Sequence, residues 1–250
     1  MLRAIHAINL ALPILALSCG EANALVGADL ADRTVQRYTV VVASAKGRCS
    51  GVVLAQDIVL TAAHCVEGKS NLHIRGNTGG GYQTLAPSAL SAVIETIQHP
   101  LYRATESGSP DLAIVKLEKP LPDRFLPVVV NPRSLNEGDN LIAAGYGQNS
   151  DRDTAAVLRM VLLRVSSAER DWVTLVRAGA DASGARPGDS GGPVFAYRGM
   201  HSVVALMVGA RPDRTRAVAL SAHYRWIRET IEKLSTPYWI RNTTDKLGTP

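Results

Sequence analysis

Gly188-Asp189-Ser190-Gly191-Gly192-Pro193 is the stretch of this sequence that decides how its other motifs are interpreted. Its three glycines allow the backbone to approach another molecule closely and to point amide groups toward it. Amide groups arranged in this way can form an oxyanion site. Taken by itself, the stretch is also compatible with an ordinary glycine-rich loop.

Two motifs upstream carry a candidate general base and a candidate partner for it. Thr61-Ala62-Ala63-His64-Cys65 places a histidine beside a cysteine. A general base needs a fixed ring and a defined tautomer, and therefore a partner that accepts a hydrogen bond from its second nitrogen. Asp111 is the candidate partner, because it opens the mostly apolar run Leu112–Leu117, where a buried carboxylate needs a specific contact.

Short β-branched runs separated by turn-forming clusters predict an all-β protein. The clusters include Gly76–Gly81 and Asn149–Asp151. Many short strands of this kind are typical of sandwiches and barrels. The predicted strands are Thr39–Val42, Gly51–Leu54, Ile58–Thr61, Leu112–Leu117, Leu141–Ala144, Val173–Val176, Val194–Tyr197 and Val203–Val208.

One helix is predicted near the end of the chain. Apolar residues recur there at helical spacing, Ser221 is the expected cap, and Pro237 is expected to close the helix. The proline-rich segment Pro120–Pro132 predicts a connection between two β units. The apolar residues of the helix are Tyr224, Ile227, Ile231 and Leu234.

The three motifs, in the order His64, Asp111, Ser190, resemble the trypsin/chymotrypsin-like serine endopeptidases over residues 25–236. Weaker matches support the resemblance: Cys49-Ser50-Gly51, His99-Pro100 with Tyr102, Gly145-Tyr146-Gly147 and Trp226-Ile227.

The resemblance implies two packed antiparallel six-stranded β-barrels and a C-terminal helix. The first barrel would occupy residues 25–128 and carry His64 and Asp111. The second barrel and the helix would occupy residues 129–236 and carry Ser190, followed by a tail at 237–250.

The resemblance also implies the role of each residue in cleaving a protein or peptide substrate through an acyl-enzyme. Ser190 would be the nucleophile, His64 the base, and Asp111 the group that orients the imidazole. The backbone N–H groups of Gly188 and Ser190 would hold the oxyanion.

The first 24 residues predict a signal peptide, so the mature protein is expected to be secreted or periplasmic. A basic start, Met1-Leu2-Arg3, precedes a short apolar core at Ile8–Leu17, and Ala22-Asn23-Ala24 fits a signal peptidase. No later apolar run is long enough to span a membrane.

Cleavage after Ala24 would leave a chain that begins Leu25-Val26-Gly27-Ala28. Members of the family pair the aspartate before the nucleophile, here Asp189, with the α-amino group of such a start. We therefore expect an ion pair between Leu25 and Asp189, made directly by signal-peptide removal. The alternative is that residues 25–28 are only an N-terminal tail.

The cysteines agree with an exported protein. Cys19 lies in the removed segment, which leaves Cys49 and Cys65 to form one disulfide worth roughly 3 kcal/mol in the chain-entropy account. Two unpaired thiols are the alternative. Lipid attachment at Cys19 is not excluded by the sequence.

Two departures from the family concern the substrate pocket. Gly184 stands where trypsin-like members carry the acid that selects Arg or Lys, so a tryptic preference is not expected. Arg186 replaces a cysteine that braces the pocket in many members. The pocket walls align with Met207-Val208-Gly209 and with a position near Ala217, which predicts an apolar or small residue before the scissile bond.

Composition and charge narrow the remaining function classes. The sequence is 46% hydrophobic and carries a formal charge of +5 without a Lys/Arg block, so nucleic-acid binding is not expected. No cofactor and no catalytic metal are expected, because the remaining histidines lack metal-ligand spacing.

Arg211, Arg214 and Arg216 are interpreted as a solvated loop, with an anionic surface or substrate as the alternative. The oligomeric state is not indicated.

Two other functions compete with a peptidase. The G-x-S-x-G pattern at Gly188–Gly192, followed by Asp213 and His223, also fits an α/β-hydrolase, but the strand–helix alternation of that fold is absent upstream. A catalytically silent binding protein of the protease fold is the second alternative. Such proteins usually lack a triad residue, whereas all three are present here.

Overall fold

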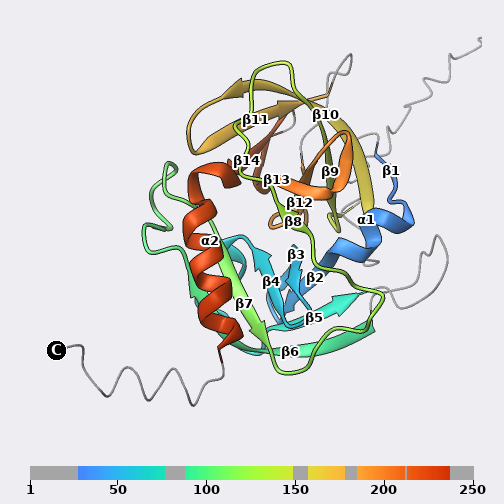
Figure 1. The fold of residues 1–250 in the computed structure, drawn as a ribbon, viewed down its shortest axis with the longest axis vertical. Coiled ribbons are helices and arrows are strands. Elements are labelled where there is room, and N and C mark those ends of the chain that lie inside the picture. The colour runs from blue at the N-terminus through green and yellow to red at the C-terminus, as the bar shows by residue number, and fades with distance from the viewer. Residues whose placement is uncertain (1–27, 77–87, 149–156, 178–184, 212, 237–250) are drawn as a thin grey trace, which may run out of the picture.

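The computed structural model describes residues 28–76, 88–148, 157–177, 185–211 and 213–236. The predicted signal peptide, Leu25, Gly184, Pro237 and the C-terminal tail lie outside these residues. In the described part, two β-barrels pack side by side with a helix along one side of the molecule (Figure 1).

The first barrel is closed and antiparallel, with strand order β2-β3-β4-β7-β6-β5. Alternate residues of β4 and β7 enter different hydrophobic clusters. Val59 and Val115 face the barrel interior, whereas Leu60 and Ile114 join a cluster that includes residues of the second barrel and of the C-terminal helix. These strands are therefore buried on both faces, which explains their continuous apolar runs. The strands are β2 (Thr39–Ser44), β3 (Gly47–Ala55), β4 (Ile58–Thr61), β5 (His73–Gly76), β6 (Ser88–Gln98) and β7 (Ala113–Leu117).

The second barrel follows the order β9-β10-β11-β14-β13-β12 and closes where β12 pairs with β9. The prediction of two six-stranded antiparallel barrels is confirmed. Two short strands, β1 (Asp29–Leu30) and β8 (Val129–Val130), add to β10 and β13. The barrel strands are β9 (Asn140–Gly145), β10 (Arg159–Ala168), β11 (Trp172–Val176), β12 (Pro193–Ala196), β13 (Gly199–Arg211) and β14 (Arg214–Ala219).

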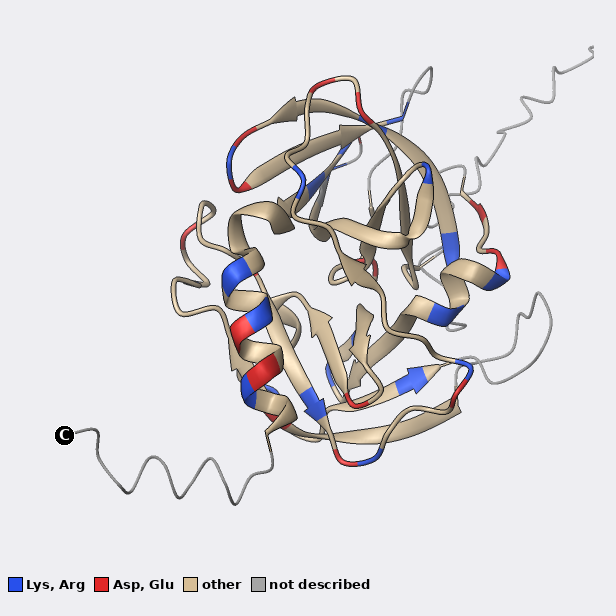
Figure 2. Cartoon of the chain, viewed as in Figure 1, with Lys and Arg blue, Asp and Glu red and all other residues tan. Residues whose placement is uncertain are grey.

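The C-terminal helix α2 (Leu220–Ser235) is present, but its predicted cap is wrong. Ala219 is the N-cap and no side chain caps the helix, because α2 begins directly after β14 and Ser221 falls in the first turn. Basic and acidic positions both lie along the helix (Figure 2), and Arg225 pairs with Glu229 at 2.9 Å. None of the helices in the described residues is long and apolar enough to cross a membrane.

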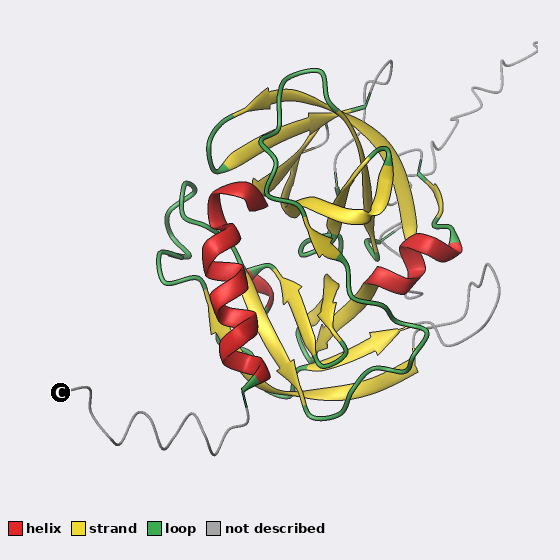
Figure 3. Ribbon diagram, in the orientation of Figure 1, coloured by secondary structure: helices red, strands yellow, loops and turns green. Residues whose placement is uncertain are grey.

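Two further helical segments and one connection complete the fold. Helix α1 (Arg33–Tyr38) is capped by Asp32, whose Oδ1 accepts a hydrogen bond from Val35 N at 2.9 Å. The 3-10 turn η1 (Ala63–Cys65) follows β4. The proline-rich segment Pro120–Pro132 runs mainly as loop between the barrels (Figure 3), as its composition predicts.

Two buried histidines join helix α2 to the first barrel. His223 of α2 and His99, which follows β6, are 6% and 7% exposed. His223 Nδ1 lies 3.2 Å from His99 Nε2, and the rings meet edge to face. Trp226 packs against His99 with ring centroids 4.7 Å apart.

The hydrogen bonds assign a neutral tautomer to each ring. Leu101 N donates to His99 Nδ1 at 3.2 Å, so the His99 proton lies on Nε2 and is donated to His223. The remaining nitrogen of His223 faces Asp171 at 3.5 Å. Burial lowers the pKa of His99 to about 4, and the neighbouring His223 adds to the shift. Burial also lowers the pKa of His223, although Asp171 opposes this.

The buried pair of His99 and His223 predicts that the folded protein becomes less stable in acid. The unfolded histidines bind protons with pKa values near 6.5, above those of the native pair, so protonation favours the unfolded chain as the pH falls. The free energy of unfolding should drop by roughly 1–3 kcal/mol between pH 7 and pH 4.5 on account of this pair. Chemical denaturation of wild type and His223→Gln over this range measures it, and the variant should show the smaller drop.

The exposed His201 provides the control. His201→Gln should retain the pH dependence of the wild type. Equal slopes in wild type and His223→Gln would contradict the assignment of neutral, buried rings.

Candidate active site

His64 lies on the turn η1, which is covalently tied to the first barrel. The predicted disulfide is present: Cys65 of η1 is bonded to Cys49 of β3, with Cα atoms 6.1 Å apart. The turn also packs tightly, since Ala63 and Cys65 are buried. The backbone of His64 is therefore held on both sides.

Asp111 holds His64 with two hydrogen bonds, one to the imidazole and one to the backbone. Its Oδ2 lies 2.6 Å from His64 Nδ1, and its Oδ1 accepts from His64 N at 2.9 Å. An ionised carboxylate only accepts, so Nδ1 carries the proton and Nε2 presents a lone pair. The side chain of His64 is 38% exposed and that of Asp111 15% exposed. The carboxylate is shielded while the ring faces solvent, as a general base requires.

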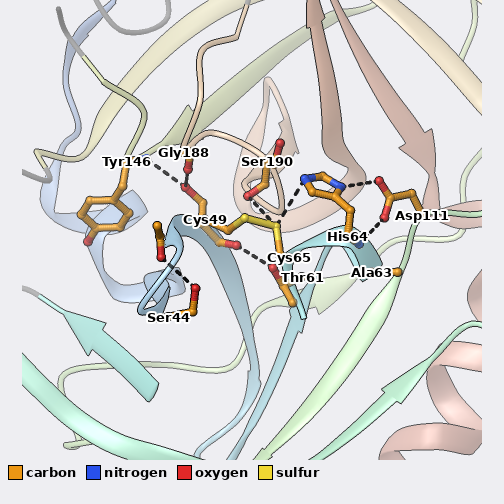
Figure 4. Close-up of a disulfide and its surroundings, with 12 residues drawn as sticks. Ser44, Cys49, Thr61, Ala63, His64, Cys65, Asp111, Tyr146, Gly188 and Ser190 are labelled. Atoms are coloured by element: carbon orange, nitrogen blue, oxygen red, sulfur yellow. Dashed lines mark hydrogen bonds and ion pairs between the residues drawn. A yellow bond between two sulfur atoms is a disulfide. The ribbon is translucent and has the colours of Figure 1, made fainter. Parts of the chain in front are cut away.

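Ser190 reaches the same edge from the second barrel (Figure 4). Its loop contains Gly188 at φ +102° and Gly191 at φ +81°, a backbone region that side chains rarely adopt. Ser190 lies beside the ring of His64 in Figure 4. Within the described residues no hydrogen bond joins Ser190 Oγ to His64 Nε2. In structures without substrate this contact is often long and tightens only on binding.

Residues 186–192 form the loop around Ser190, which is called the nucleophile loop after the role expected of Ser190. Its backbone amides divide into those that donate a hydrogen bond and those that are open. The N–H groups of Asp189, Gly191 and Gly192 donate to Arg186 O, Met207 O and Asp189 O. The N–H groups of Gly188 and Ser190 have no acceptor among the described residues. Two open amides around one serine leave donors available to an anionic oxygen.

Asp189 belongs to the same loop and is fully buried. Its Oδ1 accepts from Gly147 N and its Oδ2 from Arg186 N, each at 2.8 Å. A Cβ atom at Gly145 or Gly147 would collide with the carboxylate, so the backbone encloses it closely. Leu25 lies outside the described residues, and its pairing with Asp189 stays a prediction.

Ser50 of β3 ties the nucleophile loop to the first barrel. Its fully buried hydroxyl donates to Gly188 O at 2.8 Å and accepts from Tyr146 N at 2.9 Å. Its backbone N donates to Ser190 O at 2.8 Å, and its carbonyl accepts from Thr61 Oγ1 at 2.8 Å. Ser50 thus connects Thr61, in the motif that contains His64, with Gly188 and Ser190 in the nucleophile loop of the second barrel.

A cleft of about 270 Å³ opens beside His64, between the two barrels. Tyr102 lies in its wall and donates to Glu67 Oε2 at 3.2 Å. Burial raises the pKa of Tyr102, and Asp111 and Glu67 add to the shift, so the phenol stays neutral. Residues that line the cleft include His64, Asp111, Trp172, Val208, Gly209 and Arg216.

The predicted pocket residues divide into two groups. Val208 and Gly209 line the cleft, whereas Met207 and Ala217 are fully buried in the interior of the second barrel. Gly184 lies outside the described residues. The assignment of these five positions to a primary specificity pocket stays a prediction.

Trp172 lines the cleft and was not named by the sequence analysis, whereas Arg216, which also lines it, was interpreted there as part of a solvated loop with an anionic surface or substrate as the alternative. Arg216 belongs to strand β14 rather than to a solvated loop, and its guanidinium carbon lies 3.7 Å from the centre of the Trp172 ring. The two meet because β11 and β14 are neighbouring strands. No local motif announces such a pair.

One cluster has the composition of a metal site. Cys49, His64 and Cys65 bring their ligand atoms within 4.8 Å of one another. The two sulfurs are bonded to each other and are not thiolates, so the cluster as it stands offers a metal one histidine nitrogen. The prediction of no catalytic metal stays a prediction.

Solved structures show the same fold. Neuropsin, a serine protease expressed in mouse brain, superposes with a TM-score of 0.67 at 19% identity, over 82% of this chain and 99% of its own. The scabies mite inactivated protease paralogue S-I1 gives a TM-score of 0.67 at 20% identity, over 83% and 99%.

Curated relatives and a family model agree with the fold. Granzyme M of Rattus norvegicus is 27% identical over 210 residues, which cover 75% of this chain and 81% of the relative. Cathepsin G of Homo sapiens is 27% identical over 222 residues, with 77% and 82% covered. The family model described as Trypsin matches residues 25–227, which include His64, Asp111 and Ser190. The chain therefore belongs to the trypsin family of serine proteases.

Proposed function

We propose that the protein is a secreted or periplasmic serine endopeptidase in which His64, Asp111 and Ser190 form the catalytic triad. The observation that carries this proposal is the combination at one edge of the cleft: an imidazole whose Nε2 carries no proton lies beside a serine, and the amides of that serine and of Gly188 are open. An unprotonated imidazole nitrogen, a serine and open amides are the groups that acyl transfer uses, which supports the proposal.

The reaction follows from these positions. Ser190 Oγ attacks the substrate carbonyl while His64 Nε2 accepts its proton, and His64 then protonates the leaving amine. Asp111, hydrogen-bonded to Nδ1, stabilises the imidazolium that forms. The Gly188 and Ser190 amides stabilise the oxyanion, and each such donor is worth roughly 3 kcal/mol. Water then releases the acyl group by the same route.

Two finer features belong to the same proposal. The absence of an acid at Gly184 supports a preference other than Arg or Lys before the scissile bond, and Val208 supplies an apolar wall. The buried carboxylate of Asp189 supports activation by the amino group of Leu25 after signal-peptide removal, because a buried negative charge is stabilised by a cation.

The alternative of a catalytically silent binding protein has a structural precedent. The scabies mite paralogue is described as inactivated yet has the same fold, so fold alone does not decide activity. The presence here of His64, Asp111 and Ser190, with the first two hydrogen-bonded, favours the enzyme.

The mass of the secreted protein, before and after a fluorophosphonate probe, tests the nucleophile. One adduct is expected in wild type, because His64 activates Ser190, and none in Ser190→Ala. Cleavage of a peptide mixture should disappear in the same variant. An unlabelled wild-type protein that begins at Leu25 would favour the silent alternative.

An N-terminal extension tests the activation route. Adding one residue before Leu25 should lower kcat/KM by about 100-fold, since it displaces the amino group from a buried carboxylate. The same residue added after Pro250 is the control and should leave activity unchanged. Full activity of the N-terminally extended chain would contradict this route.

Ser50→Ala tests the tie between the barrels. The change leaves Gly188 O and Tyr146 N buried without their partner, so the free energy of unfolding should fall by about 1–3 kcal/mol. The rate of labelling by the probe should fall by about tenfold, because Gly188 carries an oxyanion donor.

Ser202 is the matched control, since it is 8% exposed and its hydroxyl has no hydrogen-bond partner in the described structure. Ser202→Ala should leave stability and labelling unchanged. If both alanine variants behave alike, the Ser50 hydroxyl has no positioning role.

A further inference from the structure

Arg216 is a cation held in a fixed place on the second-barrel side of the cleft. Its guanidinium lies over the ring of Trp172 at 3.7 Å. Trp172 Nε1 in turn donates to Gly108 O at 3.4 Å, in the loop of the first barrel that precedes Asp111. The ring therefore spans the two barrels and positions the cation above it.

The face of the guanidinium is occupied, but its edge is open. The N–H donors lie in the guanidinium plane, directed away from a stacked ring. No group among the described residues accepts a hydrogen bond from Arg216. Nearby arginines differ: Arg214 binds Asp213 at 2.6 Å, and Arg103 donates to the carbonyls of Pro100 and Tyr102.

Arg216 also faces the space that a substrate would enter. It lines the same cleft as His64, and it pairs across the hairpin with Gly209. Paired residues of antiparallel strands project from the same face. Gly209 has no side chain, so it does not cover the side chain of Arg216 on that face.

The acidic residues of the cleft leave this cation unneutralised. Asp111 is engaged by His64, and Glu106, which lines the same cleft, forms no ion pair with Arg216 in the described structure. Glu106 is exposed, so an incoming carboxylate would compete with water and with this side chain.

We propose that the open edge of Arg216 binds a carboxylate of the substrate, so that the protein prefers peptides with an Asp or Glu close to the scissile bond. The planar fork of an arginine matches both oxygens of a carboxylate. This inference rests on the proposed peptidase function and adds a substrate class to it. It takes up the anionic substrate that the sequence analysis gave as the alternative, in place of the interpretation of Arg216 as a solvated loop residue.

Matched peptides test the preference. A peptide that the protein cleaves is chosen from a mixture and resynthesised as pairs that differ only by Glu or Gln, at each position around the scissile bond in turn. At one position kcat/KM for the Glu peptide should exceed that for the Gln peptide by about 10- to 100-fold, as expected for a charge-assisted hydrogen bond. Arg216→Gln should abolish this ratio.

Three variants separate direct contact from general electrostatics. Arg214→Gln removes the same charge from the start of the same strand, β14, and should keep the ratio. Arg216→Lys keeps the charge but loses the planar fork, so an intermediate ratio is expected. Glu106→Gln removes a competing carboxylate and should keep or raise the ratio. The inference is overturned by a ratio near one in wild type, by a ratio that survives in Arg216→Gln, or by equal losses in Arg216→Gln and Arg214→Gln.

Binding distinguishes this inference from the peptidase proposal. If the probe labels no serine and no peptide is cleaved, the peptidase proposal fails. Titration calorimetry of peptide pairs with Ser190→Ala, where no cleavage interferes, still reports on Arg216. Tighter binding of the Glu peptide, lost in the double variant with Arg216→Gln, would support a carboxylate site, and equal binding of both peptides would overturn it.

Discussion

The junction between strand β3 and the nucleophile loop is the contact on which the site depends. Gly188 and Gly191 adopt positive φ angles, and a loop of such residues has little conformational preference of its own. Its geometry is imposed from the other barrel, through Ser50 N to Ser190 O and Ser50 Oγ to Gly188 O. A Cβ atom at Gly191 would collide with Thr61 and with the Ser50 carbonyl, so the two barrels meet there without spare room.

Buried polar groups give this junction its rigidity. Asp189 and Ser50 are removed from water, where each unmet hydrogen bond would be costly, so any movement of the loop that breaks their contacts is opposed. The disulfide between Cys49 and Cys65 adds a covalent restraint on the His64 side. The two barrels therefore hold His64 and Ser190 together although neither barrel contains both.

Two further contacts across the junction of the barrels involve polar groups as well as apolar packing. His99 and His223 connect the first barrel to the helix that ends the second. Trp172 reaches Gly108 across the cleft and supports Arg216. Trp172 lines the cleft, so its contact with Gly108, which joins the two barrels, also shapes the cleft.

Local patterns in the sequence were enough to predict the strands that are buried on both faces, such as β4 and β7, because each is a continuous apolar run. They were also enough to identify the motifs around His64, Asp111 and Ser190, because each motif is a short stretch of the chain. Strands such as β6 and β10 were not predicted, because their buried and exposed positions alternate without a matching alternation of apolar and polar residues. The roles of Ser50 and Arg216, and the burial of His223, were decided only by tertiary structure. Each depends on a partner far away in the chain, and a hydroxyl, a guanidinium or an imidazole acquires its function from the groups that folding places around it.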